Sequence, residues 1–311
     1  MSAFAKSPAG NGSCKTRLAL AIVAMCFLCH GLVARAADNA ASLRDQYQSL
    51  VQQLNHNQFQ RRLYLDSTEL ASTLKGDIYS VVDYPFAVVD RALHSSPEGP
   101  ANWCDVLILH LNVKYCHAST GGNGTMLAVN LGKKVEQELA DTYRVQFSYR
   151  AAPGASAEYF QVELNADNGP LGTKDYRVVL EAVPVEGNRT FLHLTYSYSY
   201  GMAGRVAMST YLATIGSDKV GFTTITGAAS TRNIKYVGGV RGLIERNTMR
   251  YYLAIDAYLS AVSSPPDKQL EQRLTRWFNA TEQYPRQLHE LDRPAYIQMK
   301  YKEYQRQQVA R

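Results

Sequence analysis

The densest group of chemically reactive side chains in this sequence lies between residues 104 and 117. Its members are two cysteines, two histidines and one acidic residue: Cys104, Asp105, His110, Cys116 and His117. Structural zinc sites commonly contain closely paired C-x2-C ligands, and the spacing C-x5-H-x5-C-H has no such pair. A disulfide, free thiols and a metal site are three separate hypotheses for this segment. The spacing argues most strongly against the metal, and we expect no metal or other cofactor.

A second candidate is His193, which alternates with Thr195 and Ser197 along residues 190–200. If this face of a strand lines a cavity, a histidine there is suited to general acid–base chemistry. The competing interpretation is a structural or solvent-facing histidine. Other catalytic motifs are missing, since the sequence has no G-x-S-x-G nucleophile elbow. The glycine-rich residues 121–124 are not followed by Lys-Ser/Thr and indicate a turn rather than a phosphate loop.

An apolar stripe rich in tyrosine follows the helical period between residues 240 and 262. Its central members are Tyr251, Tyr252, Ile255, Tyr258 and Leu259. Tyrosine combines an apolar ring with a hydroxyl that can orient a ligand, so this stripe is a candidate cavity lining. The alternative is that the same stripe is filled core.

The first 36 residues show the successive parts of a secretory signal peptide. Three basic residues, Lys6, Lys15 and Arg17, precede an apolar run over residues 18–28, and Ala34-Arg35-Ala36 supplies an A-x-A cleavage site. A membrane-spanning helix needs about 20 apolar residues, which this run does not reach. We therefore expect cleavage after Ala36 and a periplasmic mature protein.

Removal of residues 1–36 changes the charge of the protein. The whole chain has 33 Lys and Arg against 27 Asp and Glu, and the removed segment holds four of the basic residues and no acidic one. The mature chain is close to neutral, so no basic surface predicts binding to nucleic acid.

The cysteine content points to the same compartment. Three of the five cysteines leave with residues 1–36, and only Cys104 and Cys116 remain. An even pair in an exported protein favours a disulfide. On one continuous helix the two residues would lie about 18 Å apart, so the bond requires the helix to end near Asn112 and the chain to turn back.

The secondary structure around these residues is mixed. Periodicity predicts strands over residues 63–67 and 77–82, then two helices that end near residue 111, then five antiparallel strands between residues 126 and 200. A long helix over residues 240–262 and another from residue 265 follow. An amphipathic helix over residues 40–58 precedes them all. Residues 202–214 fit a helix or a strand, residues 219–226 suggest one more strand, and the tail from Pro285 onward is polar and is expected to attach loosely.

This order resembles the START-like superfamily, also called SRPBCC or polyketide-cyclase-like. The resemblance rests on residues 76–85 (GDIYSVVDYP), which join a strand to a proline-initiated helix, on the following Trp103, and on residues 246–252 (RNTMRYY) of the long helix. It covers about residues 63–262. The signal peptide and the flanking helices at 40–58 and 265–283 depart from the superfamily.

The resemblance implies an α+β helix-grip fold, in which a curved antiparallel sheet wraps around the long C-terminal helix. We expect a signal peptide over residues 1–36, an N-terminal helix over 37–62, a START-like domain over 63–264 and a helical extension with a polar tail over 265–311. The resemblance also implies a cavity for an apolar molecule between the sheet and the long helix.

Function is less specific than fold, because one fold hosts many activities. The leading hypothesis is periplasmic binding or carriage of a hydrophobic, lipid-like molecule, with His193 and Thr195 joining the helix residues in the lining. The second is a cyclase- or aromatase-like enzyme that uses His193 with a nearby tyrosine. The third is an interaction module whose flanking helices contact an envelope membrane or a membrane protein.

Overall fold

The computed structural model describes residues 38–122, 124–151, 158–213, 218–225 and 234–309. The expected signal peptide over residues 1–36 lies outside them. The strands are β1 (Leu63–Glu69), β2 (Thr73–Val82), β3 (Val113–Gly121), β4 (Gly124–Leu131), β5 (Tyr143–Ala151), β6 (Phe160–Asn168), β7 (Thr173–Val185) and β8 (Arg189–Tyr200). The helices are residues 38–55, α2 (Phe86–Asp90), α3 (Gly99–Leu107), α4 (Met202–Ala213), α5 (Gly239–Ser260), α6 (Pro266–Thr281), α7 (Pro285–Leu288) and α8 (Arg293–Val309).

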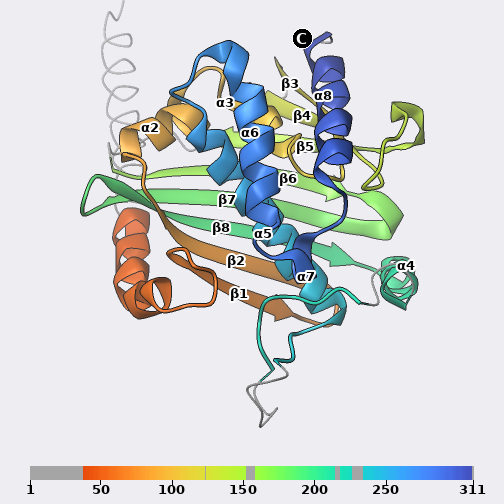
Figure 1. Ribbon diagram of the computed structural model, residues 1–311, viewed down its shortest axis with the longest axis horizontal. Helices are drawn as coiled ribbons and strands as arrows, with labels where there is room; N and C mark the ends of the chain where they lie inside the picture. Colours follow the sequence, from red (N-terminus) through yellow and green to blue (C-terminus); the bar gives the residue numbers. More distant parts are fainter. Residues whose placement is uncertain (1–37, 123, 152–157, 214–217, 226–233, 310–311) are drawn as a thin grey trace, which may run out of the picture.

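The strands form one antiparallel sheet in the order β1-β2-β8-β7-β6-β5-β4-β3. The second strand therefore pairs with the last one, and helices α2 and α3 occupy the connection between β2 and β3. Helix α5 follows the sheet in sequence and packs against β2 and β8 on one side and α6 on the other (Figure 1). This arrangement is the α+β helix-grip fold that the sequence predicts.

The face of the sheet toward α5, here called the inner face, carries the main core. Strand β8 contributes the apolar members of its alternating pattern to this face, among them Leu192, Leu194 and Tyr196, as period-2 geometry requires. Helix α5 approaches β2 very closely at Gly76, where a Cβ atom would collide with the Thr248 hydroxyl. A glycine at position 76 thus lets the long helix lie directly on the sheet.

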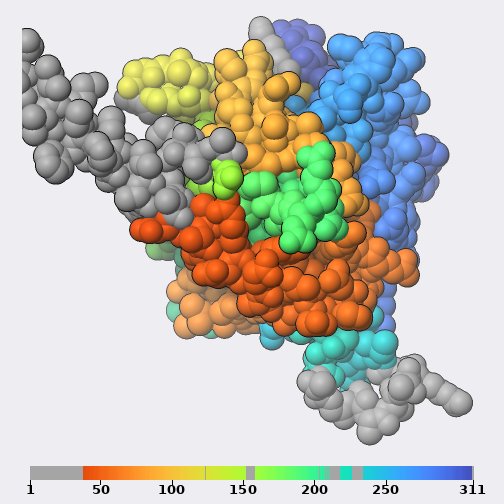
Figure 2. All heavy atoms as spheres, turned by 90° about the vertical axis from the view of Figure 1, so that its left-hand side faces the viewer, coloured from red at the N-terminus to blue at the C-terminus, as the bar shows by residue number. Residues whose placement is uncertain are grey.

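The outer face of the sheet is covered in part by the helix over residues 38–55. Leu43 and Leu54 of this helix are buried in a second apolar cluster with Tyr79 of β2 and Phe191 of β8. Figure 2 shows the red-orange N-terminal segment on the molecular surface beside the green turn that joins β7 to β8. The amphipathic pattern of this segment therefore marks the side that packs on the main sheet.

The C-terminal part of the chain differs from the sequence-based prediction. Residues 285–309 were expected to attach loosely, but they form α7 and α8, and Tyr296, Met299 and Lys300 of α8 are buried. Tyr296 stacks on Trp277 of α6 with 4.9 Å between ring centroids. A buried ion-pair group adds to this contact, in which Glu303 bonds Lys114 of β3 at 3.0 Å and Lys300 at 2.6 Å. Because the buried residues of α8 include the charged Lys300 and Glu303, the helix has no simple apolar pattern that would predict its burial.

Two further segments also depart from prediction. Residues 113–121 form β3, an edge strand that the sequence analysis did not identify. Residues 219–226 were expected to form a strand, but the described part of this segment has only one isolated bridge, between Thr224 and Tyr236. Residues 202–213, which were ambiguous, form helix α4.

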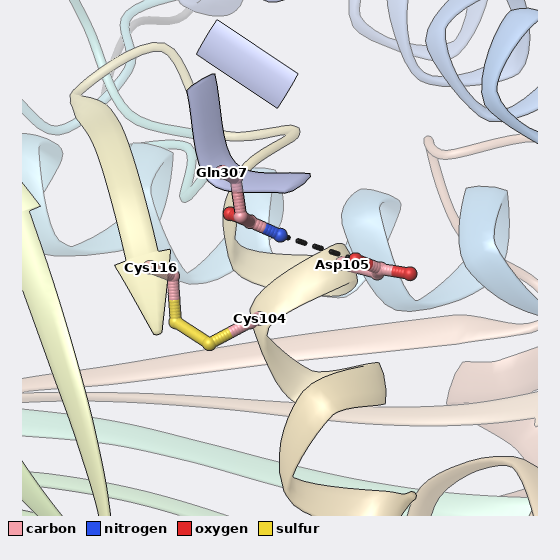
Figure 3. The surroundings of a disulfide bond; sticks show 4 residues. All are labelled: Cys104, Asp105, Cys116 and Gln307. Carbon is pink, nitrogen blue, oxygen red and sulfur yellow. Dashed lines mark hydrogen bonds between the residues drawn. A yellow bond between two sulfur atoms is a disulfide. The ribbon is translucent and has the colours of Figure 1, made fainter. Parts of the chain in front are cut away.

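A disulfide and a buried carboxylate join several of these elements (Figure 3). Cys104 of α3 bonds Cys116 of β3, as the sequence predicts. The adjacent Asp105 accepts hydrogen bonds from Gln307 of α8 at 3.1 Å and from Arg273 of α6 at 3.1 Å. Helix α3 ends at Leu107 and the chain turns back into β3, which is the geometry that the disulfide needs.

Candidate ligand-binding cleft

A cleft of about 540 Å³ lies between α5 and the inner face of the sheet. Tyr176 of β7, Tyr196 of β8 and Tyr251 of α5 provide its aromatic walls, and His110 comes from the segment between α3 and β3. Asn247 of α5 also lines the cleft, and the remaining lining residues come from the ends of strands and the loops around them: Asn112, Leu131, Gly132, Lys133, Gln137, Asp141, Tyr143, Pro170 and Leu171. The cleft thus combines aromatic walls with polar side chains at positions 110, 112, 133, 137, 141 and 247. Aromatic surface with converging polar groups is found in many small-molecule sites.

The three tyrosine rings contact one another around the cleft. Tyr196 meets Tyr251 edge to face, with 5.1 Å between the ring centroids, and Tyr176 lies 6.4 Å from Tyr196. Burial raises the pKa of all three phenols, since it disfavours the charged form. The hydroxyl groups therefore remain neutral at physiological pH and can orient a ligand by hydrogen bonding.

His110 is the most constrained polar group of the cleft. Its ring stacks on Tyr251 with 4.7 Å between centroids, and its side chain is buried. The backbone N–H of Asn112 donates to Nδ1 at 3.1 Å, so Nδ1 is an acceptor and the proton of the neutral ring resides on Nε2. Nε2 is buried and has no hydrogen-bond partner among the described residues.

The charges around His110 are predominantly positive. Burial, and then the nearby cations Arg250 and Lys300, hold the pKa of His110 well below its ordinary value. Lys134 and Lys114 act in the same direction. The ring is therefore a neutral N–H donor at physiological pH and does not act as a cation.

Helix α8 holds the segment that carries His110. Lys300 donates to the backbone carbonyl oxygens of His110 at 2.7 Å and Val113 at 2.8 Å, and the Tyr296 hydroxyl donates to the Leu109 carbonyl at 3.1 Å. The C-terminal helix consequently positions the histidine of the cleft. The sequence alone does not indicate this relation, because Lys300 and His110 are far apart in the chain.

The structure places only one member of the α5 stripe in the cleft. Tyr251 lines it, whereas the Tyr252 hydroxyl is 2.7 Å from the Ser80 hydroxyl and is buried against β2. Ile255 and Leu259 are core residues, and Arg273 stacks over the ring of Tyr258 at 4.2 Å. For these four residues the alternative interpretation, filled core, describes the geometry.

His193 and Thr195 lie on the outer face of the sheet, so their predicted position in the cavity is wrong. His193 stacks on Tyr79 with 4.3 Å between ring centroids, and the hydroxyl of Tyr79 accepts a hydrogen bond from Gln46 of the helix over residues 38–55. The predicted alternation along β8 is present, but its Leu/Tyr face is the one that points toward α5. The apolar character of that face was the signal that could have identified Tyr196 as a cleft residue.

A polar cluster surrounds His193 on the outer face. Its Nε2 is 2.9 Å from Asp77 and its Nδ1 is 3.1 Å from Glu181, and the Thr195 hydroxyl donates to Asp77 at 2.7 Å. Burial alone would lower the pKa of His193, but hydrogen bonds and charge attraction from Asp77 and Glu181 raise it above its ordinary value. This cluster is satisfied internally and serves to join β2, β7 and β8.

The described residues contain no group of three or more His, Cys, Asp or Glu side chains arranged to hold a metal ion. Within the same part of the chain, no helix is both long and apolar enough to cross a membrane.

Comparison with known proteins gives only remote similarity. No protein-family model and no curated protein matches the chain. Among solved structures, a point mutant of norcoclaurine synthase from Thalictrum flavum is 17% identical over 48% of this chain and 89% of that chain, with a TM-score of 0.32. A protein from Arthrobacter aurescens is 15% identical over 64% of this chain and 92% of that chain, and Ara h 8.0201 is 14% identical over 46% and 91%; both have a TM-score of 0.30. The helix-grip fold of this chain follows from its own strand order and helix placement.

Proposed function

We propose that this protein binds a small hydrophobic molecule in the α5 cleft and carries it in the periplasm after export through a cleaved signal peptide. Loading or release of the molecule at an envelope membrane is part of this proposal. The observation that carries it is the cleft itself, in which the rings of Tyr176, Tyr196 and Tyr251 surround about 540 Å³ beneath the long helix. Aromatic rings provide a large apolar contact area that suits another flat or apolar molecule.

The residue named for the catalytic alternative, His193, does not lie in the cleft. A cyclase- or aromatase-like reaction was assigned to His193 with a nearby tyrosine, but His193 lies on the outer face and pairs with Asp77 and Glu181. In the cleft, the tyrosine pKa values are raised and the pKa of His110 is lowered. These directions favour hydrogen-bond donors over groups that exchange protons near neutral pH, so binding describes this site better than catalysis.

A fluorescent apolar probe tests whether the cleft binds ligands. We expect N-phenyl-1-naphthylamine to bind the protein saturably at one site. Leu131→Trp, which fills the cleft from β4, should weaken this binding about tenfold or more because an indole occupies the space of the probe. Leu70→Trp is the matched control, since Leu70 is an exposed residue that does not line the cleft. Absence of saturable binding, or equal binding by both variants, contradicts the proposal.

The natural ligand and the compartment are tested together on protein purified from a periplasmic fraction. We expect the intact mass to correspond to a chain that begins at Ala37. We also expect organic extracts of repeated preparations to contain the same small hydrophobic molecule. Full-length protein confined to the cytoplasm contradicts the export part. Repeatedly empty protein contradicts carriage.

A further inference from the structure

The unsatisfied N–H of His110 indicates what the cleft ligand must offer. Nε2 is buried and has no partner among the described residues, although His110 belongs to the cleft wall. Buried polar groups are nearly always hydrogen-bonded in folded proteins. A donor without a partner beside an open cleft is therefore suited to an acceptor that a bound molecule brings with it.

The donor character of this group is set by the backbone. Because the Asn112 N–H donates to Nδ1, the neutral ring must carry its proton on Nε2. Nε2 can then donate a hydrogen bond but cannot accept one. A ligand that presents only N–H or O–H donors at this point would leave the site unsatisfied.

The electrostatic surroundings favour a negative acceptor over a neutral one. Arg250 is buried beside the site and Lys134 lies near it, and both form ion pairs with Glu290 at 2.7 and 2.6 Å. Lys114 and Lys300 similarly share Glu303. The charges that act most strongly on the His110 ring are these four cations, and all of them lower its pKa, so the surroundings of the ring are positive. The cleft lining itself adds one cation, Lys133, and one carboxylate, Asp141. A hydrogen bond to an ionised acceptor is also stronger than one to a neutral acceptor.

We propose that the ligand is an aromatic or other apolar molecule with one anionic acceptor group, such as a carboxylate or sulfonate, which binds the Nε2–H of His110. The apolar part of the ligand contacts Tyr176 and Tyr196, and the acceptor points toward the wall that His110 shares with Tyr251. This inference rests on the proposed function, because it names the class of molecule that the same cleft binds.

Two probes with the same ring system separate this inference from the function itself. N-Phenyl-1-naphthylamine is apolar, and 8-anilinonaphthalene-1-sulfonate adds one sulfonate to the same skeleton. His110→Phe keeps an aromatic ring beside Tyr251 but removes the hydrogen-bond donor. We expect this variant to lower the affinity for the sulfonate probe about tenfold or more. The same variant should weaken binding of the apolar probe far less, so the ratio of the two affinities, which is the readout, should change by about tenfold. His110→Gln, which restores an N–H, should recover part of the sulfonate affinity.

The outcomes distinguish the two claims. If the wild-type protein binds neither probe, the proposed function fails. If it binds both and His110→Phe weakens both equally or neither, the ligand class is overturned while the function stands.

A measurement on the unaltered protein covers the case in which the variants do not fold. With ¹⁵N-labelled histidine, NMR should show a neutral His110 protonated at Nε2. The Nε2 signal should shift when the sulfonate probe is added and remain in place with the apolar probe. A proton on Nδ1, or no shift with the sulfonate, overturns the inference.

Discussion

At the scale of single residues, two histidines have pKa values that are shifted in opposite directions. His110 lies among cations, and burial together with these charges lowers its pKa, whereas Asp77 and Glu181 outweigh burial and raise the pKa of His193. The first histidine is therefore a neutral donor in the cleft. The second lies between two carboxylates that favour its charged form, and it joins strands on the outer face of the sheet.

The His193 cluster predicts a specific dependence of stability on pH. A raised histidine pKa contributes stability that is fully present below the unfolded value of about 6.5 and is lost as pH rises through the folded value. Since hydrogen bonds from His193 lower the pKa values of Asp77 and Glu181 despite their burial, their share is present above about pH 4 and is lost as pH falls. The cluster is consequently most stabilising between about pH 4.5 and 6.5.

We expect His193→Gln to reduce the free energy of unfolding by about 1 to 3 kcal/mol at pH 5.5 and by less at pH 9. Urea unfolding at the two pH values measures the difference. His289→Gln is the control, because His289 is half exposed and its ion pair with Glu282 lies at the surface, where such pairs contribute about 1 kcal/mol or less. An equal cost of His193→Gln at both pH values would show that charge on His193 is not the source of stability.

At the scale of elements, α8 is attached to the sheet by buried charges. Glu303 lies between Lys114 and Lys300, and all three side chains are almost fully buried. Burial is the largest influence on Lys300 and lowers its pKa to about 8, although Glu303 opposes this. The same lysine also holds the His110 carbonyl, so the ion-pair group connects the C-terminal helix to the candidate site.

We expect Glu303→Gln to destabilise the protein by about 3 to 5 kcal/mol, because it leaves two buried cations without a counter-charge. Glu136→Gln removes the carboxylate of another α8 ion pair, Glu136–Lys302, which is about half exposed. This control should cost about 1 kcal/mol or less. Chemical denaturation of both variants measures the contrast, and similar costs would contradict the assigned role of the buried group.

At the scale of the whole molecule, the flanking helices belong to the packed structure. Trp277 of α6 is buried and donates to the Arg250 carbonyl of α5 at 3.2 Å, and α8 supplies the buried Lys300. Deletion of residues 265–311 would therefore expose the core around α5. A test of the partner-docking hypothesis requires substitutions of exposed residues on these helices instead of their removal.

The disulfide predicts a global effect on stability. Replacing both Cys104 and Cys116 with alanine should lower the free energy of unfolding by about 3 kcal/mol, since the bond closes a short loop in the unfolded chain. Urea denaturation of the oxidised wild type and the double variant measures this loss. The reduced wild type should resemble the double variant. An unchanged unfolding midpoint in both would contradict the stabilising role.

Local patterns were sufficient to predict much of the fold. Periodicity identified the long α5 helix and the alternation of β8, because both depend on short repeats along the chain. The cysteine pair and the need for a turn after α3 also followed from spacing and helix geometry. The edge strand β3, which contains Cys116 and His117, is not among the strands that the sequence predicts.

The site depended on contacts between residues far apart in the sequence. Alternation shows that His193 and Tyr196 lie on opposite faces of β8, but it does not show which face α5 will cover. His110 is held in the cleft wall by α8, whose Lys300 lies 190 positions later in the chain and bonds the His110 carbonyl. Strand and helix periods act over a few residues, whereas the packing of α5 and α8 unites distant segments. Only the tertiary structure therefore decides which face of β8 points inward and that Nε2 of His110 finds no partner in the described part of the chain.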